Sequence, residues 1–466
     1  MAPLLDTFYQ SNSLTLKILS LLRYYGVFRK TYRFLKKSQW WSKEELEAYQ
    51  LGQLQNLLHH AYENVPYYRR VFDERQLKPE DIRSLADLQM LPYLTKDIVQ
   101  NNREELKARN YPEEAFEYVT SGGTTGNPLG FYYEKGVSRA KEWAFMKTQW
   151  DRVGYSFFDK CVILRGNIVK SANDGKYWEK SFFGRWLILS SYHMNNDTIA
   201  DYAHQIRLFR PKFIQAFPST IFTIAQYIKD NRIEEKFPTL QAILCGSEKV
   251  YPWERELIES VFKCRIYSWY GMSEQVTLAG ECEDNAEYHI FSEYGIVELI
   301  SDTGSQIHQT EEQGEVVATS LTNYCFPFIR YRTKDHAIMA TNENCECGRH
   351  YSRLKTVVGR DYEYIMTSKG KVILSFASTP SSTFDNVLKF QFIQEKIGEV
   401  TMNIVKKSTY TDRDSDTILQ TLQRKMGNDV HIDIQFVVDI PKTKNGKYQF
   451  FIQNIPLEEK SDGVKS

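Results

Sequence analysis

The glycine-rich segment Thr120–Pro128, with the sequence TSGGTTGNP, is the first place where residue types and spacing indicate chemistry. Glycines let a backbone turn tightly and point its N–H groups at an anion, and hydroxyl side chains add further donors. No Gly-Lys-Ser/Thr follows, so the segment is not a Walker A loop, and a polar hairpin turn is the alternative interpretation. We expect a phosphate-binding loop made by Ser121, Gly122, Gly123, Thr124, Thr125 and Gly126.

Cysteine and histidine residues form a second group that could do chemistry. Cys345 and Cys347 are a Cys-x-Cys pair, and Cys282 and His289 precede them along the chain. Three thiolates and one imidazole suit tetrahedral zinc in a closed, structural site. Four protein ligands leave no open position, so we expect such a metal to hold a loop in place and not to catalyse. Reduced, unbound cysteines with His289 on a strand surface are the alternative.

The segments that must position these residues follow two patterns. From about Ala115 onward, short β-rich runs alternate with helical stretches, which predicts α/β layers around a largely buried sheet. Residues 1–110 are predicted to form a helical segment that precedes this α/β part. Within it, the spacing of Ser42 and Glu45 predicts a capping box at the start of a helix over Ser42–Glu63.

A domain boundary is predicted near Gly359–Asp361. The order strand, strand, helix, strand follows it, which predicts a small α+β unit. The predicted segments are Phe390–Gln394, Val400–Val405, Asp414–Met426 and His431–Val438. The expected fold class is therefore α/β, with a large multi-layer N-terminal domain at 1–358 and a small α+β C-terminal domain at 359–456. The polar end, 457–466, is expected to be disordered.

Composition and charge exclude several classes of protein. The 466 residues include 59 Lys and Arg and 59 Asp and Glu, and a net charge of zero argues against nucleic acid as the main partner. No apolar run approaches the roughly 20 residues of a membrane-spanning helix, and no secretory signal is visible. The seven cysteines are odd in number and unevenly spread, which is not typical of a disulfide framework. We therefore expect a cytoplasmic protein with reduced thiols.

The segment Ser11–Lys37 is both basic and apolar. No Asp or Glu occurs between Thr7 and Ser42, although the same stretch carries seven Lys and Arg. One interpretation is a surface helix that rests on anionic lipid, which would place the protein at the inner face of a membrane. The other is a helix packed on the domain with a solvated charged face.

Four further motifs follow the glycine-rich loop in order. They are YGMSE at Tyr270–Glu274, YRTKD at Tyr331–Asp335, the pair Gly359–Arg360, and PKTKNGK at Pro441–Lys447. This ordered series resembles the adenylate-forming superfamily, which includes acyl-CoA synthetases, the adenylation domains of peptide synthetases and luciferases. LCGSE at Leu244–Glu248 and the Cys-x-Cys-Gly resemble the phenylacetate–CoA ligase and CapK-like branch, in which comparable Cys and His positions are similar to zinc ligands.

The resemblance implies a role for each motif in binding a nucleotide. The glycine-rich loop would hold the departing β- and γ-phosphates of ATP. Glu274 would bind magnesium through oxygen, as a hard cation prefers, and Ser273 would donate to the α-phosphate. Tyr270 would offer its ring to adenine. Further nucleotide-binding residues implied by the resemblance are Gly246, Ser247, Glu248 and Gly271.

The later motifs would complete the site. Asp335 would accept hydrogen bonds from the ribose hydroxyls, with Arg360 nearby. Lys447 would reach the α-phosphate and the substrate carboxylate as a fixed cation, and its Lys-Asn-Gly-Lys context is also a good hairpin turn. His193 is a candidate for orienting the substrate carboxylate, and a histidine satisfied within the fold is the alternative.

Three positions depart from the superfamily pattern. Leu129 stands where many relatives have Lys, and Lys334 stands where the ribose motif usually has Gly. Asp361 follows the arginine of the hinge motif directly, which leaves the identity of the hinge residue open.

The resemblance implies an enzyme that needs ATP and Mg²⁺. A carboxylate is a poor acyl donor, and its attack on ATP gives an acyl-AMP with a good leaving group and releases pyrophosphate. The substrate would be a small or medium carboxylic acid and the acceptor CoA or another group, and the CapK resemblance points to surface-polysaccharide assembly. One alternative is transfer directly to a sugar or an amine without free acyl-CoA. The other alternative is a non-catalytic nucleotide-binding protein. The presence of Glu274, Asp335 and Lys447 argues against it, because a degenerate relative usually loses at least one of them.

Overall fold

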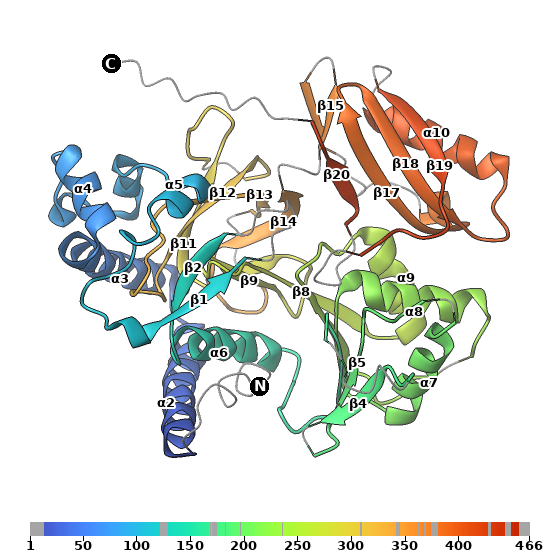
Figure 1. Ribbon diagram of the computed structural model, residues 1–466, viewed down its shortest axis with the longest axis horizontal. Coiled ribbons are helices and arrows are strands. Elements are labelled where there is room, and N and C mark those ends of the chain that lie inside the picture. The colour runs from blue at the N-terminus through green and yellow to red at the C-terminus, as the bar shows by residue number, and fades with distance from the viewer. Residues whose placement is uncertain are drawn as a thin grey trace. The chain divides into compact units, whose positions relative to one another are not determined.

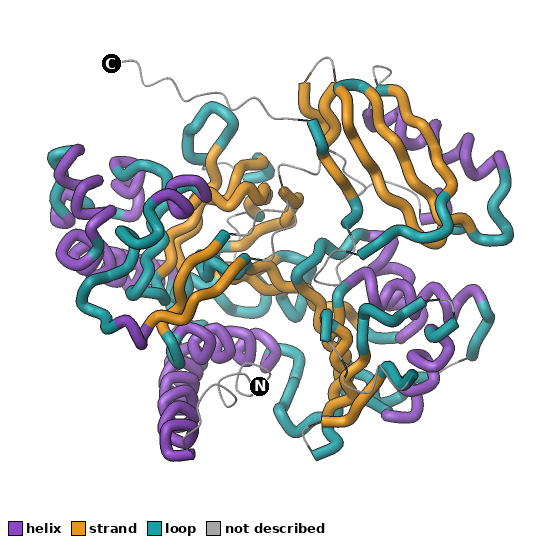
Figure 2. The backbone as a smooth tube through the Cα atoms, in the orientation of Figure 1, coloured by secondary structure: helices purple, strands orange, loops and turns teal. Residues whose placement is uncertain are grey.

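The computed structural model describes residues 14–121, 129–167, 169, 175–181, 183–195, 197–234, 236–307, 310–341, 345–360, 364–367, 370–373, 381–426, 430–442 and 449–455. Contacts divide the chain into two units: Met1–Asp159 with Tyr267–Val358, and Lys160–Ile266 with Gly359–Ser466. Helices, strands and loops of both units are shown in Figures 1 and 2. No helix in the described part of the chain has the length and apolar character needed to cross a membrane.

The first unit begins with helices that precede its strands. These are α2 (Leu14–Ser38), α3 (Lys43–Asn64), α4 (Pro66–Glu74) and α5 (Lys96–Asn101), with 3-10 turns at Pro79–Asp81, Leu85–Met90 and Glu113–Ala115. The capping box predicted for α3 is confirmed. The Glu45 N–H donates to the Ser42 hydroxyl at 3.2 Å, and the Ser42 N–H donates to the Glu45 carboxylate at 2.7 Å.

Strands of the first unit lie on both sides of helix α6 (Ser138–Asp151) in the sequence. A hairpin of β1 (Phe116–Thr120) and β2 (Gly130–Glu134) precedes it. The larger set runs in the spatial order β11-β12-β13-β14-β10-β9-β8, and its outer pair β11–β12 is antiparallel. Its strands are β8 (Arg265–Gly271), β9 (Leu278–Glu281), β10 (Tyr288–Ile290), β11 (Gly295–Ile300), β12 (Gln313–Ser320), β13 (Tyr331–Met339) and β14 (Arg353–Arg360).

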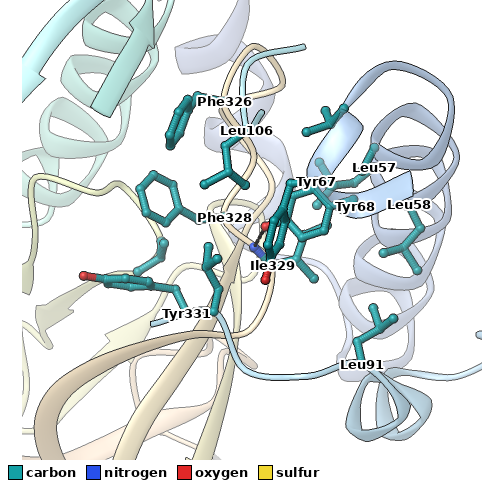
Figure 3. Packing of buried hydrophobic residues seen from close by; sticks show 14 of the residues in the cluster. Leu57, Leu58, Tyr67, Tyr68, Leu91, Leu106, Phe326, Phe328, Ile329 and Tyr331 are labelled. Atoms are coloured by element: carbon teal, nitrogen blue, oxygen red, sulfur yellow. Dashed lines mark hydrogen bonds between the residues drawn. The ribbon is translucent and has the colours of Figure 1, made fainter. Parts of the chain in front are cut away.

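The main core of the first unit joins α3 and α4 to the segment that leads into β13 (Figure 3). Buried leucines of α3 and aromatic residues of both parts fill it. The Tyr68 hydroxyl donates to the Pro327 carbonyl at 3.0 Å and accepts from the Ile329 N–H at 3.0 Å. This buried tyrosine therefore fixes the backbone that enters the Tyr331–Asp335 motif.

The second unit begins with a parallel sheet. Its spatial order is β7-β6-β3-β5-β4, in which β7, β6, β3 and β5 are parallel and the edge strand β4 is antiparallel. Apolar strands pack with the helices into one buried cluster, as expected for a sheet connected by helical crossovers. The elements are β3 (Cys161–Leu164), β4 (Trp178–Ser181), β5 (Trp186–Leu189), α7 (Ile199–Phe209), β6 (Phe213–Ala216), α8 (Pro218–Asp230), β7 (Ala242–Gly246) and α9 (Pro252–Phe262).

The C-terminal part of the second unit is a four-stranded sheet in the order β19-β18-β17-β20, with a separate hairpin of β15 and β16. The Gln226 amide of α8 donates to the Val387 carbonyl at 2.8 Å, and Lys407 pairs with Asp230 at 2.8 Å. The elements are β15 (Tyr364–Thr367), β16 (Gly370–Ile373), a 3-10 turn at Ser381–Phe384, β17 (Val387–Lys396), β18 (Glu399–Lys406), α10 (Asp412–Met426), β19 (His431–Phe436) and β20 (Phe451–Gln453).

The predicted α/β class, with a small α+β part at the C-terminus, is confirmed. The predicted strand, strand, helix, strand order corresponds to β17, β18, α10 and β19, and the sequence reading missed β15, β16 and β20. Contacts group Lys160–Ile266 with the C-terminal part, so the division into domains at 1–358 and 359–456 stays a prediction. The expected tail, 457–466, lies outside the described residues.

Candidate active site

The glycine-rich segment connects β1 to β2, in which Thr120 pairs with Gly130. At the base of the loop, the Ser121 N–H donates to the Leu129 carbonyl at 2.8 Å, and the Ser121 hydroxyl accepts from the Leu129 N–H at 2.9 Å. Ser121 therefore closes the loop. Leu129 belongs to the buried core, which explains an apolar residue at this position. Phosphate binding stays a prediction because five of its residues lie outside the described part: Gly122, Gly123, Thr124, Thr125 and Gly126.

The YGMSE motif covers the end of β8 and the turn that follows. Tyr270 and Gly271 pair with β9, and Ser273 and Glu274 lie in the turn. The Tyr133 hydroxyl of β2 donates to the Ser273 carbonyl, and the Glu274 side chain is buried. Burial, with Glu142 and Glu274 nearby, raises the pKa of Tyr133, so its hydroxyl stays protonated and can donate. The strand that follows the loop is thus bonded to the turn that carries the predicted magnesium ligand.

The YRTKD motif is bonded to the YGMSE motif through its aspartate. The Tyr270 hydroxyl donates to the Asp335 carboxylate at 2.9 Å, and Asp335 is only 8% exposed. The Asp335 N–H donates to the Thr333 hydroxyl at 3.0 Å. The structure therefore brings together the residues predicted to contact adenine and ribose.

Lys334 has a left-handed backbone, with φ of +63°. This conformation favours glycine, which explains why the superfamily motif usually has Gly there. The Glu315 carboxylate of β12 accepts from the Lys334 N–H at 3.1 Å and also pairs with Arg332. A buried acid on the neighbouring strand thus stabilises the bend that precedes Asp335.

The LCGSE residues lie in the second unit, where β7 ends. Ser247 has a positive φ of 70°, and its hydroxyl accepts from the Arg165 guanidinium at 3.2 Å. The Glu248 carboxylate accepts from the Ser219 N–H at 3.1 Å, at the first turn of α8. An acid at this place is favourable because the N-terminus of a helix carries a partial positive charge. Burial lowers the pKa of Arg165 to about 10.

His193 is half-buried and has two partners in the second unit. Its Nδ1 lies 2.8 Å from the Ser190 hydroxyl, and its ring stacks on Tyr177 with centroids 4.9 Å apart. These contacts agree with a histidine satisfied within the fold, and a role toward the substrate stays a prediction.

Arg360 is the last residue of β14, and its side chain is outside the described part, as is the whole of Lys447.

The predicted Cys–His group is assembled within the first unit. The ligand atoms of Cys282, His289, Cys345 and Cys347 all lie within 4.8 Å of one another. Cys282 follows β9 and His289 lies in β10, so one antiparallel hairpin supplies two of the four. The other two come from a turn in which the Gly348 N–H donates to the Cys345 carbonyl at 3.0 Å. Three soft thiols and an imidazole so placed fit a tetrahedral zinc site.

Charges around this Cys–His group fit a bound metal as well. Hydrogen bonds from the Cys282 thiol and from His289 lower the pKa of Cys347 and favour its thiolate. The guanidinium nitrogens of Arg152 are buried without a hydrogen-bond partner among the described residues, and Cys347 and Arg152 interact electrostatically. Three thiolates with one Zn²⁺ carry a net charge of −1, which the buried guanidinium group of Arg152 would offset.

Comparisons with known proteins show what this chain is similar to. The family model for the CapK C-terminal domain matches residues 365–454. Protein CapK of Staphylococcus aureus is 23% identical over 422 residues, which cover 88% of this chain and 90% of CapK. A phenylacetate-coenzyme A ligase of Thermus thermophilus is 27% identical over 68% of this chain and 71% of its own. The chain is thus similar, over most of its length, to the CapK and phenylacetate-CoA ligase branch of the adenylate-forming ligases.

The fold of this chain is shared with a solved structure. It is a 2-hydroxyisobutyryl-CoA ligase in the postadenylation state, in complex with R3-HIB-AMP. It superposes with a TM-score of 0.69 at 16% identity and covers 89% of this chain and 91% of its own. The large N-terminal part and the small C-terminal α+β part therefore share the fold of that solved structure.

Sequence reasoning missed several residues of the ligase that hold the motifs in place. They carry no motif of their own, and only long-range contacts reveal them. Lys442 differs from the others because it lies within a motif, PKTKNGK. Its ammonium donates to the Ser191 carbonyl at 2.5 Å. Burial lowers the pKa of Lys442 to about 8. The other missed residues are Tyr133, Arg165, Ser219 and Glu315.

Proposed function

We propose that this ligase activates a small or medium carboxylic acid as an acyl-AMP and releases pyrophosphate from ATP. The observation that carries the proposal is the hydrogen bond from Tyr270 to buried Asp335, which joins two nucleotide motifs. Glu274 is buried on the same turn that follows Tyr270. A carboxylate and an aromatic ring held in this way need no rearrangement to meet ribose and adenine, which is the preorganisation that catalysis favours.

Each of four motif residues has a definite task in this proposal. Asp335, oriented by the Tyr270 hydroxyl, accepts from the ribose hydroxyls. Glu274 supplies carboxylate oxygen to Mg²⁺, which, when bound, would neutralise phosphate charge. Ser273 donates toward the α-phosphate while its carbonyl is held by Tyr133. Lys447, carried over from the motif, supplies a cation to the carboxylate and the α-phosphate.

CoA is the acceptor that we propose for the second step, because the relatives include phenylacetate-coenzyme A ligases and the structural neighbour is named a CoA ligase. The match to CapK extends over more of the chain, 88% against 68%. It supports the alternative that the acyl group passes to a sugar or an amine during surface-polysaccharide assembly.

The proposal is tested by ATP–pyrophosphate exchange with a panel of carboxylic acids. Exchange should depend on one class of acid, and Lys447→Ala should lower its rate about 100-fold or more, since a charge acting mainly in the transition state is lost. Normal exchange by Lys447→Ala would refute the assignment of Lys447. Exchange with none of the acids would count against activation itself. Mass spectrometry of the product made with CoA present, or with amino sugars present, then identifies the acceptor.

We also propose that Cys282, His289, Cys345 and Cys347 bind one structural Zn²⁺. The support is the spacing of their ligand atoms and the buried guanidinium group of Arg152 nearby. The metal would cross-link the β9–β10 hairpin to the Cys345–Gly348 turn, and its binding free energy would contribute to folding.

Elemental analysis of protein purified without added metal tests the zinc site. We expect about one zinc per chain, and Cys347→Ser should lower the zinc content and the thermal stability together. Cys264→Ser is the matched control, because Cys264 lies outside the Cys–His group and is partly exposed. Active protein without zinc would reject the site. Full zinc content in Cys347→Ser would reject this set of ligands.

A further inference from the structure

Helix α2 has one face packed on the protein and an opposite face in solvent. Tyr24 and Leu35 are buried, and α2 lies against α6. The opposite face begins with Leu22 and Tyr25, which are 61% and 56% exposed. Figure 1 shows one end of α2 extending beyond α6. This arrangement agrees with the packed-helix interpretation from the sequence, in which the charged face is solvated, and the lipid-binding interpretation stays a prediction.

The exposed face of α2 is strongly basic. Its residues recur every three or four positions, which places them along one line of an α-helix. They are Leu22, Tyr25, Arg29, Arg33 and Lys37, with Lys30 and Lys36 beside the line and Trp40 just past its end. Leu22 and Lys37 are fifteen positions apart, about 22 Å along the helix.

Most cations on this face have no acidic partner. Within the described residues, Lys36 pairs with Asp151 at 3.3 Å, whereas Arg29, Lys30, Arg33 and Lys37 make no ion pair. Arg23, on the flank of the helix, pairs with Glu134 at 3.1 Å. Four exposed cations thus remain available to an anionic surface, and no Asp or Glu of α2 opposes them.

We propose that this face of α2 docks the ligase on an anionic lipid surface. The arginines and lysines would face phosphate headgroups. Leu22 and Tyr25 would enter the interfacial region, where aromatic side chains are favoured. This proposal goes beyond the ligase reaction and does not depend on it.

The pattern of the face favours lipid over nucleic acid. Large apolar side chains, Leu22 and Tyr25, adjoin the cations on this face, and such a combination suits a lipid interface better than a nucleic-acid phosphate backbone. A flat row of cations that follows one helix matches a planar surface, and headgroup phosphates supply the complementary charge.

Co-sedimentation of the full chain with vesicles tests the proposal. The vesicles contain phosphatidylglycerol and phosphatidylcholine in equal parts, and pure phosphatidylcholine vesicles are the reference. We expect binding to the first and not to the second, weakening as salt rises. Each removed cation should weaken binding about fivefold, so Arg29→Gln/Arg33→Gln/Lys37→Gln should bind about 100-fold less tightly.

A matched variant separates local from overall charge. Arg232→Gln/Lys236→Gln/Lys263→Gln removes the same charge from exposed positions of the second unit and should bind as the unchanged protein does. Circular dichroism verifies that both variants fold. Leu22→Ser/Tyr25→Ser should weaken binding without changing its salt dependence. The proposal is wrong if anionic vesicles do not bind at low salt, if both triple variants lose binding equally, or if the chain binds duplex DNA but not vesicles.

Discussion

Tyr270→Phe removes one hydroxyl and leaves the aromatic ring in place. That hydroxyl donates to the Asp335 carboxylate at 2.9 Å, and Asp335 is 8% exposed, so little water can replace the donor. A hydrogen bond to a charged group contributes about 1.5–3 kcal/mol, and leaving a buried acceptor unsatisfied costs a similar amount. Partial solvation of Asp335 in the variant would reduce this cost. We therefore expect the free energy of unfolding to fall by about 1–2 kcal/mol.

The effect on nucleotide binding can be worked out from the same contact. The ring that would stack on adenine remains, so any loss must pass through the orientation of Asp335. A loss of about 1.4 kcal/mol in the bound state corresponds to a tenfold higher KM for ATP in pyrophosphate exchange. The maximal exchange rate should change less, because the hydroxyl touches neither the carboxylic acid nor the α-phosphate in the proposed site.

Denaturant unfolding and the ATP dependence of exchange measure the two effects. Tyr25→Phe is the control, because Tyr25 is 56% exposed on α2, and it should change neither quantity. A double-mutant cycle with Asp335→Asn isolates the pair. If Tyr270→Phe raises the KM for ATP equally in the Asp335→Asn background, the tyrosine does not act through Asp335. Unchanged stability and unchanged KM would refute the reasoning altogether.

Two further predictions concern strained or buried lysines. Lys334, with φ of +63°, should accept glycine without loss of stability, whereas Lys334→Val should lose about 1–2 kcal/mol in denaturant unfolding, because β-branched residues fit the left-handed region poorly. Equal stability of the glycine and valine variants would contradict this. Burial lowers the pKa of Lys442 from 10.5 to about 8, so between these pH values the unfolded chain binds more protons and stability rises with pH. Lys442→Met should abolish that rise and increase the free energy of unfolding at pH 7 by about 1–3 kcal/mol. If the variant keeps the rise, another group causes it.

Local patterns in the sequence were sufficient for much of the fold. The apolar runs that became β6 and β7 are buried along their whole length, and the capping box of Ser42 and Glu45 formed as expected. The short strands β15, β16 and β20 were missed because they are brief and carry little periodic signal. The cysteine and histidine spacing predicted a group that only a tertiary contact between the β9–β10 hairpin and the Cys345–Gly348 turn could assemble.

The candidate site was predictable only as far as its motifs reach. The motif sequences identify Tyr270 and Asp335, but neither predicts that the two residues share a hydrogen bond, because 65 positions separate them in the chain. The donors and acceptors that hold the motifs, such as Tyr133, occur in segments whose composition is ordinary. Such residues follow from packing between elements, and no spacing rule in one segment can reveal them.

The bend at Lys334 shows why these motif residues depend on one another. A left-handed lysine is unfavourable by itself. The Glu315 carboxylate compensates for it, because this buried acid accepts from the Lys334 N–H and pairs with Arg332. Glu315 lies where the register between β12 and β13 shifts, so the irregularity of the sheet and the bend occur together. Immediately after the bend, Asp335 meets the Tyr270 hydroxyl, so backbone strain at one residue orients the carboxylate proposed to hold ribose.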